Sequence, residues 1–147
     1  MGIDQNQSDS VHLSAGVSGI DDILRGGFPE DCLYLLQGTP GAGKTTLAMQ
    51  FLLEGVRVGE SSMYITLSET KREIEKVARS HGWNLSGIHI CELIPSETNL
   101  GANAQLTVFN PSELELGETT EAMLAAVNKH KPKRIVIDSR NTGREVN

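Results

Sequence analysis

Hydrophobic and polar residues follow two periods along this chain, and together they predict alternating strands and helices. Short runs of apolar and β-branched residues indicate buried strands, while apolar residues three and four positions apart indicate amphipathic helices. In chain order the pattern predicts a strand at 33–37, a helix at 43–58, a strand at 63–67, a helix at 70–81, a strand at 88–93, a helix at 111–130 and a strand at 134–138. This alternation favours an α/β fold with a mostly parallel sheet and right-handed crossovers.

The stretches outside this alternation are less regular. Residues 1–10 are polar and are predicted to be disordered. Residues 11–30 predict a short extended piece and a helical turn that ends at two glycines. Residues 95–111 are interrupted by Asn, Gly and Pro and predict a long loop, and residues 140–147 predict a polar, irregular tail. We therefore expect one domain over 11–139, between two irregular ends.

Local signals refine two of the predicted helices. Thr70 and Glu73 have the spacing of a capping box, which predicts that a helix begins directly after Thr70. In the last predicted helix, Met123, Leu124 and Val127 are close enough in helical projection to share one face. We expect this face to point toward the core.

The composition fits a single cytoplasmic domain. The chain has 147 residues, of which 38% are hydrophobic, and this is enough for a sizeable core. Its 13 basic and 19 acidic residues give a net charge of −6, which argues against a broad surface for nucleic acid or an anionic membrane. No apolar stretch approaches the ~20 residues of a membrane span, and the first residues lack the pattern of a signal peptide. Cys32 and Cys91 are predicted to be reduced, half-buried thiols.

The most informative motif is a glycine-rich segment between the first predicted strand and the first predicted long helix. Residues 38–45 read Gly-Thr-Pro-Gly-Ala-Gly-Lys-Thr, a complete G-x-x-x-x-G-K-[ST] phosphate-binding loop. A strand that delivers such a turn to a helix N-terminus presents backbone N–H groups and the positive end of the helix dipole to a polyphosphate. The predicted nucleotide-binding residues are Gly38, Thr39, Pro40, Gly41, Ala42, Gly43, Lys44, Thr45 and Thr46.

Two residues of this loop and one distant aspartate predict a magnesium nucleotide site. Lys44 is the candidate catalytic lysine because its side chain is placed to reach the β- and γ-phosphates, and the Thr45 hydroxyl is a candidate Mg²⁺ ligand. Asp138 ends the last predicted strand, so its carboxylate belongs at the same edge of the sheet, where it would hold Mg²⁺ directly or through a water. These residues predict binding of a nucleoside triphosphate.

Glu69 is the second candidate catalytic residue. It follows the second predicted strand and therefore also belongs at the carboxyl edge of the sheet. A carboxylate there can orient or deprotonate the water that attacks the γ-phosphate. It can equally well stabilise the N-terminus of the helix that follows. Position alone leaves both roles open.

Three segments share a pattern with a known family. Residues 18–29 read Ser-Gly-Ile-Asp-Asp-Ile-Leu-Arg-Gly-Gly-Phe-Pro, and together with residues 38–48 and 63–70 they resemble the signature of the KaiC-like ATPase domains of the RecA-like P-loop superfamily. Residues 108–120 look like the KaiC-like group specifically. The resemblance implies a RecA-like fold that binds ATP with Mg²⁺ and assembles into a homo-oligomeric ring, with nucleotide at the subunit interfaces. Members are ATPases, and some are regarded as autophosphorylating serine/threonine kinases.

The chain departs from this family pattern in two places. The clock proteins of the family carry paired glutamates after the second strand, whereas this chain has Ser68 and Glu69, and the resemblance favours Glu69 as the catalytic residue. After Ser139 the family continues into further helices and strands, one of which lies between the strands at 33–37 and 134–138. We therefore expect a C-terminally truncated domain whose sheet is incomplete after the fourth core strand, and ATP binding more readily than turnover.

Two other functions stay open at this point. The first is a DNA-dependent ATPase of the recombinase or helicase type, against which the acidic charge argues. The second is a non-catalytic fragment that another subunit completes. Apart from the ring that the resemblance implies, the residues do not indicate a protein partner.

Overall fold

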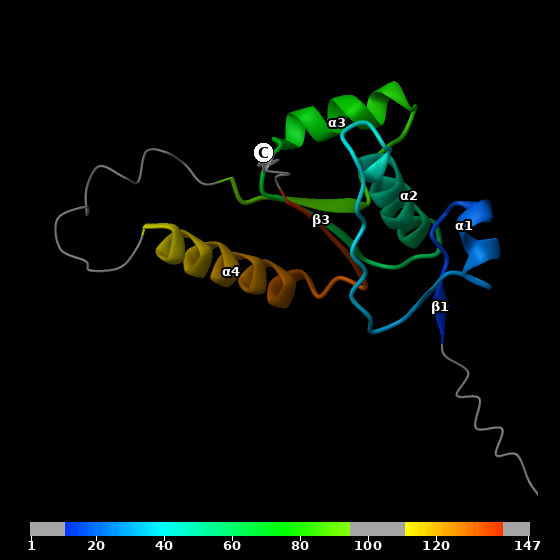
Figure 1. The fold of residues 1–147 in the computed structure, drawn as a ribbon, viewed down its shortest axis with the longest axis horizontal. Helices are drawn as coiled ribbons and strands as arrows, with labels where there is room; N and C mark the ends of the chain where they lie inside the picture. The colour runs from blue at the N-terminus through cyan, green and yellow to red at the C-terminus, as the bar shows by residue number, and fades with distance from the viewer. Residues whose placement is uncertain (1–10, 95–110, 140–147) are drawn as a thin grey trace, which may run out of the picture.

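The computed structural model describes residues 11–94 and 111–139. In chain order its elements are β1 (His12–Leu13), α1 (Ser18–Ile23), β2 (Phe28–Pro29), α2 (Lys44–Arg57), β3 (Ser62–Thr66), α3 (Lys71–Ser80), β4 (Ile88–Glu92), α4 (Pro111–His130) and β5 (Arg134–Asp138) (Figure 1). Among these described helices, none is both long and apolar enough to cross a membrane. The predictions for 1–10, 95–110 and 140–147 lie outside the described residues.

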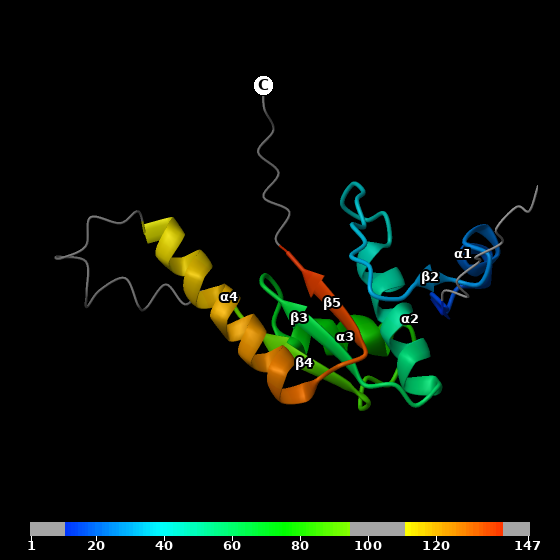
Figure 2. The ribbon, with the colours of Figure 1, turned by 90° about the horizontal axis from the view of Figure 1, so that it is seen from below.

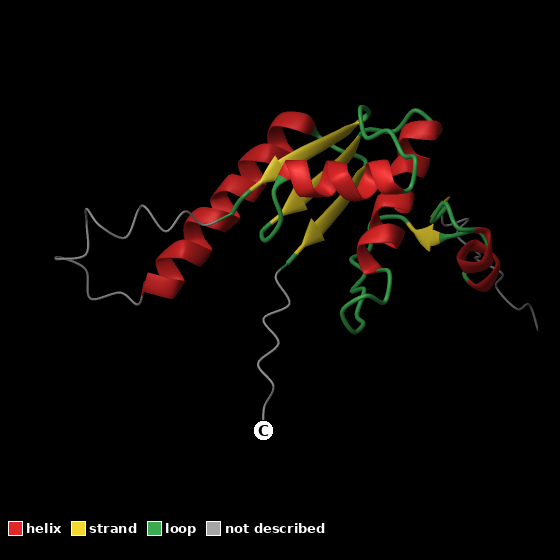
Figure 3. Cartoon of the chain, turned by 90° about the horizontal axis from the view of Figure 1, so that it is seen from above, coloured by secondary structure: helices red, strands yellow, loops and turns green. Residues whose placement is uncertain are grey.

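A parallel sheet with the order β4-β3-β5 lies at the centre of the fold. Its register places Tyr64 of β3 beside Ile90 of β4 and Val136 of β5. Every residue of β3 is buried, as expected for the central strand of a parallel sheet that is covered on both faces. Figure 3 shows the three strands pointing in one direction. The prediction of an α/β fold with a parallel sheet is confirmed.

Helices lie on both faces of this sheet, although Ile135 and Ile137 of β5 stay exposed on one of them. On one face, Tyr64 packs in the main hydrophobic cluster with Leu52 of α2 and Ile74 of α3. α4 lies on the other side of the sheet from α3 (Figure 1 and Figure 2), and His130 at its C-terminal end stacks on His89 of β4. Tyr64 and His89 point to opposite faces because side chains alternate along paired strands. The chain therefore forms three layers, with the sheet in the middle.

The detailed predictions for two helices have different outcomes. α3 begins with the predicted capping box, in which the Thr70 hydroxyl accepts a hydrogen bond from the Glu73 N–H and the Glu73 carboxylate accepts one from the Thr70 N–H. In α4, Met123 and Val127 are half-buried, but the prediction for Leu124 was wrong, because this side chain is 57% exposed. Met123 and Val127 are one turn apart, whereas Leu124 is rotated by about 100° from Met123, outside the strip of α4 that reaches the sheet.

The strand predicted at 33–37 is not formed. These residues make an irregular, exposed segment in which Leu33 is 96% and Leu35 is 85% exposed. A strand needs a neighbour for its backbone hydrogen bonds, and none of the described strands pairs with this segment. The outer edge of β5 is likewise unpaired within the described residues. Because the segment 33–37 pairs with none of the described strands, the neighbouring Cys32 is exposed, and the prediction that it is half-buried was wrong. Cys91 in β4 is half-buried, as predicted.

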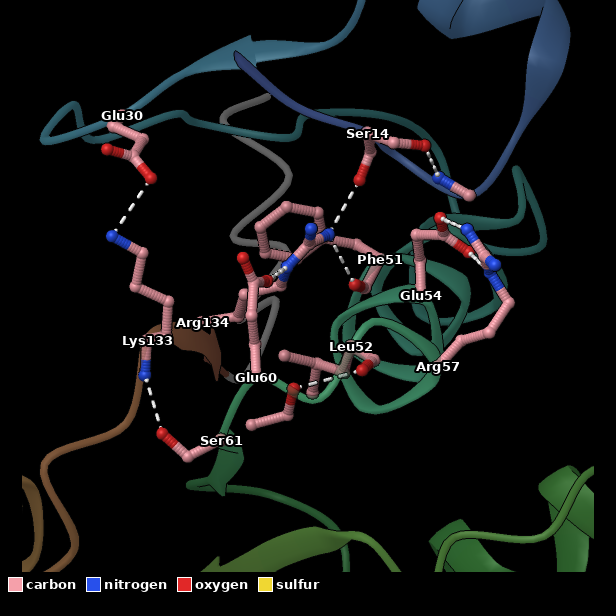
Figure 4. Close-up of polar contacts among 12 residues, drawn as sticks. Ser14, Glu30, Phe51, Leu52, Glu54, Arg57, Glu60, Ser61, Lys133 and Arg134 are labelled. Atoms are coloured by element: carbon pink, nitrogen blue, oxygen red, sulfur yellow. Dashed lines mark hydrogen bonds and ion pairs between the residues drawn. The ribbon is translucent and has the colours of Figure 1, made fainter. Parts of the chain in front are cut away.

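Arg134, at the start of β5, anchors the N-terminal segment to α2 (Figure 4). Its side chain is only 2% exposed, and its Nε donates a hydrogen bond of 2.6 Å to the Glu60 carboxylate. Its Nη1 donates to the carbonyl oxygens of Ser14 at 2.6 Å and Phe51 at 3.0 Å. The guanidinium carbon lies 4.7 Å from the centre of the Phe51 ring. One buried cation thus connects β5, α2 and the segment before α1, and it holds that segment against the helix that carries the phosphate loop.

The stacked imidazoles of His89 and His130 predict a pH-dependent stability. Burial lowers the pKa of His89, and the neighbouring His130, Lys129 and Lys71 lower it further. Between this lowered pKa and the usual value of about 6.5, the unfolded chain binds more protons than the folded chain, so stability falls as the pH drops through this window. When the pH is lowered from about 7.5 to about 5.5, we expect the Tm of His89→Gln to decrease less than the Tm of the wild type.

Thermal unfolding followed by circular dichroism measures this difference. His12→Gln, in the exposed strand β1 outside the three-stranded sheet, is the matched control and should lose as much Tm as the wild type. A His89→Gln chain with the pH dependence of the wild type would show that the stacked pair does not control this loss.

Candidate functional site

The phosphate-binding loop connects the exposed segment 31–37 to α2. Gly43 is the N-cap residue of α2 with φ 87°, and Gly41 has φ 82°. Both values lie in the left-handed region that favours glycine. The Thr39 carbonyl closes the turn by accepting a hydrogen bond of 3.1 Å from the Ala42 N–H. The first N–H groups of α2 have no partners within the helix, so the loop presents a row of donors to an anion.

Lys44 folds back over this loop. Its Nζ donates hydrogen bonds to the carbonyl oxygen of Gly38 at 2.7 Å and to that of Thr39 at 3.0 Å. Because these carbonyls belong to the loop itself, the ammonium group is held where a polyphosphate in the loop would meet it. This geometry suits the role that the motif predicts for Lys44.

Asp138 and Glu69 both lie at the carboxyl end of the sheet. Asp138 is the last residue of β5, and its carbonyl oxygen accepts a hydrogen bond of 3.0 Å from the N–H of Leu67, just past β3. The Thr66 hydroxyl donates to the Glu69 carbonyl and accepts from the Glu69 N–H, each at 2.9 Å. These bonds hold the turn that carries Glu69. The parallel strands therefore bring the two predicted carboxylates to the same end of the sheet.

The Glu69 carboxylate has an unsatisfied oxygen. Its Oε2 is buried and has no hydrogen-bond partner, and it is the only side-chain atom in this state in the described part of the chain. Burial raises the pKa of Glu69, and the nearby Asp138 and Glu73 raise it further. A buried polar atom without a partner is rare in folded proteins and calls for an explanation. A carboxyl group in this state is suited to accept a proton or to approach a cation.

Tyr64 connects the Asp138 carboxylate to the phosphate loop. Its hydroxyl donates a hydrogen bond of 2.6 Å to Asp138 Oδ2. Burial and this carboxylate raise the pKa of Tyr64, and a side-chain hydrogen bond with Thr45 acts in the opposite direction. Thr45, Tyr64 and Asp138 come from α2, β3 and β5, so three elements meet at one point. The sequence analysis missed Tyr64, because a tyrosine in the middle of a buried strand has the pattern of a core residue.

The oxygen atoms gathered at this point fit a Mg²⁺ ion. In nucleotide sites Mg²⁺ is usually held by one or two carboxylates together with substrate phosphates. Thr45 and Asp138, the two residues predicted to hold the ion, supply a hydroxyl and a carboxylate, and Glu69 follows β3 at the same end of the sheet. Within the described residues there is no group of three or more His, Cys, Asp or Glu side chains that would hold a metal. With Thr45 and Asp138 as protein ligands, phosphate oxygens and water would complete the coordination of the ion.

The fold and these residues together define a class of protein. A parallel β4-β3-β5 sheet flanked by helices, with a phosphate-binding loop at the start of α2 and carboxylates at the strand ends, is a partial RecA-like fold. The family described as "ATPase: KaiC" matches residues 13–145. The chain belongs to this KaiC ATPase family, as the resemblance implied, and membership indicates nucleotide binding.

Curated relatives are similar to this chain over most of its length. A UPF0273 protein of Thermotoga maritima is 31% identical over 135 residues, which cover 88% of this chain and 56% of the relative. A UPF0273 protein of Pyrococcus horikoshii is 30% identical over 135 residues, covering 88% and 55%. The circadian clock oscillator protein KaiC of Thermosynechococcus vestitus is 31% identical over 138 residues, covering 92% and 26%. The chain thus spans about half the length of the UPF0273 proteins that it matches.

Proposed function

We propose that this chain binds Mg-ATP, with residues 38–46 around the phosphates and Mg²⁺ between Thr45 and Asp138. The observation that carries the proposal is the hydrogen bond of the Tyr64 hydroxyl to Asp138 at the end of β5, because Thr45, at the start of α2, acts on the same hydroxyl. The carboxyl ends of the strands are where ligands bind in open α/β sheets. The phosphate loop lies at the N-terminus of the same helix as Thr45, so one nucleotide can reach both parts of the site.

Each residue of the proposed site has a separate role. Lys44 and the free N–H groups of α2 neutralise and orient the β- and γ-phosphates. Bound Mg²⁺ would neutralise further negative charge on the phosphate oxygens. Glu69 orients the attacking water and accepts its proton as the water oxygen bonds to the γ-phosphorus and the bond to the β–γ bridging oxygen breaks. The raised pKa of Glu69 and its unpartnered Oε2 support this role.

Hydrolysis and assembly are proposals for the whole protein. We place the ATP-binding domain at 11–139 and propose that the intact protein is a cytoplasmic, homo-oligomeric ring with nucleotide at its subunit interfaces, as the resemblance implies. A basic residue from a neighbouring subunit is worth about 10³–10⁵-fold in rate in related phosphoryl-transfer sites. We therefore expect this chain alone to bind ATP more readily than to hydrolyse it. Autophosphorylation on serine or threonine is implied for some relatives and has no residue assigned here.

Replacing Lys44 by alanine tests the binding proposal. We expect isothermal titration of the wild type with ATP in the presence of Mg²⁺ to show saturable binding, and Lys44→Ala to abolish it, because the variant loses the cation that faces the phosphates. Lys76→Ala, an exposed lysine on α3, is the matched control and should bind as the wild type does. A folded wild-type chain without ATP binding, or a Lys44→Ala chain that binds normally, would overturn the proposal.

A further inference from the structure

The hydroxyl of Tyr64 is a polar group inside the hydrophobic core. The side chain is 1% exposed, and its ring belongs to the cluster that includes Met49, Leu52 and Ile74. Tyr64 lies opposite Val136 in the sheet register, so Asp138 is its diagonal neighbour two residues further along β5 on the same face. An aromatic side chain can span this diagonal, and here the phenol oxygen reaches Asp138 Oδ2 at 2.6 Å. The ring thus packs as a core residue while its hydroxyl lies at the carboxyl edge.

The hydroxyl of Tyr64 acts as a hydrogen-bond donor in this structure. It donates to one oxygen of the Asp138 carboxylate, Oδ2. A carboxylate with one oxygen held in this way presents its other oxygen in a fixed direction. Thr45, in the first turn of α2, also acts on this phenol.

We propose that Tyr64 is a positioning residue of the nucleotide site, which orients the Asp138 carboxylate relative to Thr45 and so raises the affinity of the site for Mg²⁺. This inference rests on the proposed function, since the ion is expected to bind only together with a nucleotide. Tyr64 does not touch the phosphates or the ion. It acts through Asp138, in the way that outer residues orient the first ligands of a metal.

The Mg²⁺ dependence of ATP binding tests this role. In Tyr64→Phe, which keeps the ring in the core, we expect the half-saturating Mg²⁺ concentration to rise about tenfold, the loss expected for one hydrogen bond to a charged group. The affinity for ATP without Mg²⁺ should stay unchanged, whereas a purely structural hydroxyl would change both affinities or neither. The chain has one other tyrosine, Tyr34, which donates to the Pro29 carbonyl in the exposed segment, and Tyr34→Phe is the matched control.

A double-mutant cycle and a measurement on the unmutated chain complete the test. If Tyr64 acts through Asp138, then Tyr64→Phe added to Asp138→Asn should leave the Mg²⁺ dependence of the single Asp138→Asn variant unchanged. In the wild type labelled with 3-fluorotyrosine, Mg²⁺ added to the ATP complex should shift the ¹⁹F resonance of Tyr64 and leave that of Tyr34 in place. This second measurement does not depend on whether Tyr64→Phe folds.

The outcomes separate this inference from the proposed function. A wild type that fails to bind ATP overturns the proposed function and, with it, this inference. A wild type that binds Mg-ATP, together with a Tyr64→Phe variant of unchanged Mg²⁺ dependence or an unshifted Tyr64 resonance, overturns the inference alone.

Discussion

Replacing Glu69 by glutamine should lower the rate of ATP hydrolysis by about 10²–10⁴-fold and at the same time raise the Tm of the nucleotide-free chain. The rate falls because an amide cannot accept the proton of the attacking water. The Tm rises because the raised pKa of Glu69 means that the folded chain holds the charged carboxylate unfavourably. Between the usual pKa of 4.5 and the raised value, the folded state binds more protons than the unfolded state, so stability falls as the pH rises through this window.

Two measurements on the same variant check this prediction. Phosphate release in a single turnover reports the rate, and thermal unfolding at neutral pH reports the stability. Glu121→Gln, an exposed glutamate on α4, is the matched control, because Glu121 lies outside the proposed chemistry. It should leave both the Tm and the rate close to those of the wild type. A Glu69→Gln chain that is less stable than the wild type would show that the carboxylate has a structural partner.

Replacing Arg134 by alanine should cost about 3 kcal/mol in the free energy of unfolding. The side chain is 2% exposed, and its loss removes the donor to the Glu60 carboxylate and to the Ser14 and Phe51 carbonyls. We expect a value at the lower end of the range for a broken buried ion pair, because the Glu60 side chain is 24% exposed and keeps some water. The N-terminal segment should also be cut faster by proteases, since Arg134 holds it against α2.

Urea denaturation measures this loss, and the next residue along the chain supplies the control. Lys133 pairs with Glu30 at 2.9 Å, but its side chain is 48% exposed. An exposed ion pair contributes about 0–1 kcal/mol, so Lys133→Ala should stay close to the wild type. Equal losses in the two variants would mean that the buried contacts of Arg134 do not set its contribution.

The helices were predictable because their signals are local. The capping box at Thr70 and the periodic apolar residues of α2 and α3 depend on neighbours one turn away, and all of them are found as predicted. The prediction that Leu124 points toward the core was wrong, because tertiary packing decides how wide a strip of α4 meets the sheet. The failure at 33–37 has the same origin. A run of apolar residues indicates that a segment prefers burial. A strand forms only where another strand supplies partners for its backbone N–H and C=O groups.

The candidate site was predictable where a motif or a strand end marks a residue. The phosphate loop, Lys44 and Thr45 follow from the fixed spacing of the motif, and Asp138 and Glu69 follow from their places after two parallel strands. Their roles remain proposals, but the structure does bring the two carboxylates to one end of the sheet. Tyr64 was missed because it looks like any core residue of a strand. Its hydroxyl gains a role only through Asp138, a partner 74 residues away.

The sequence by itself determined the α/β class, the helix boundaries, the phosphate loop and the carboxylates that end the strands. All of these depend on residue spacing within one turn or one strand, where covalent geometry brings the groups together. Tertiary structure alone decided that 33–37 stays exposed, that Arg134 becomes a buried link between three segments, and that Tyr64 donates to Asp138. These features depend on which elements become neighbours, because strand pairing and buried polar contacts join residues that are distant in the chain. The sequence around one of these residues does not indicate which distant residue it will contact.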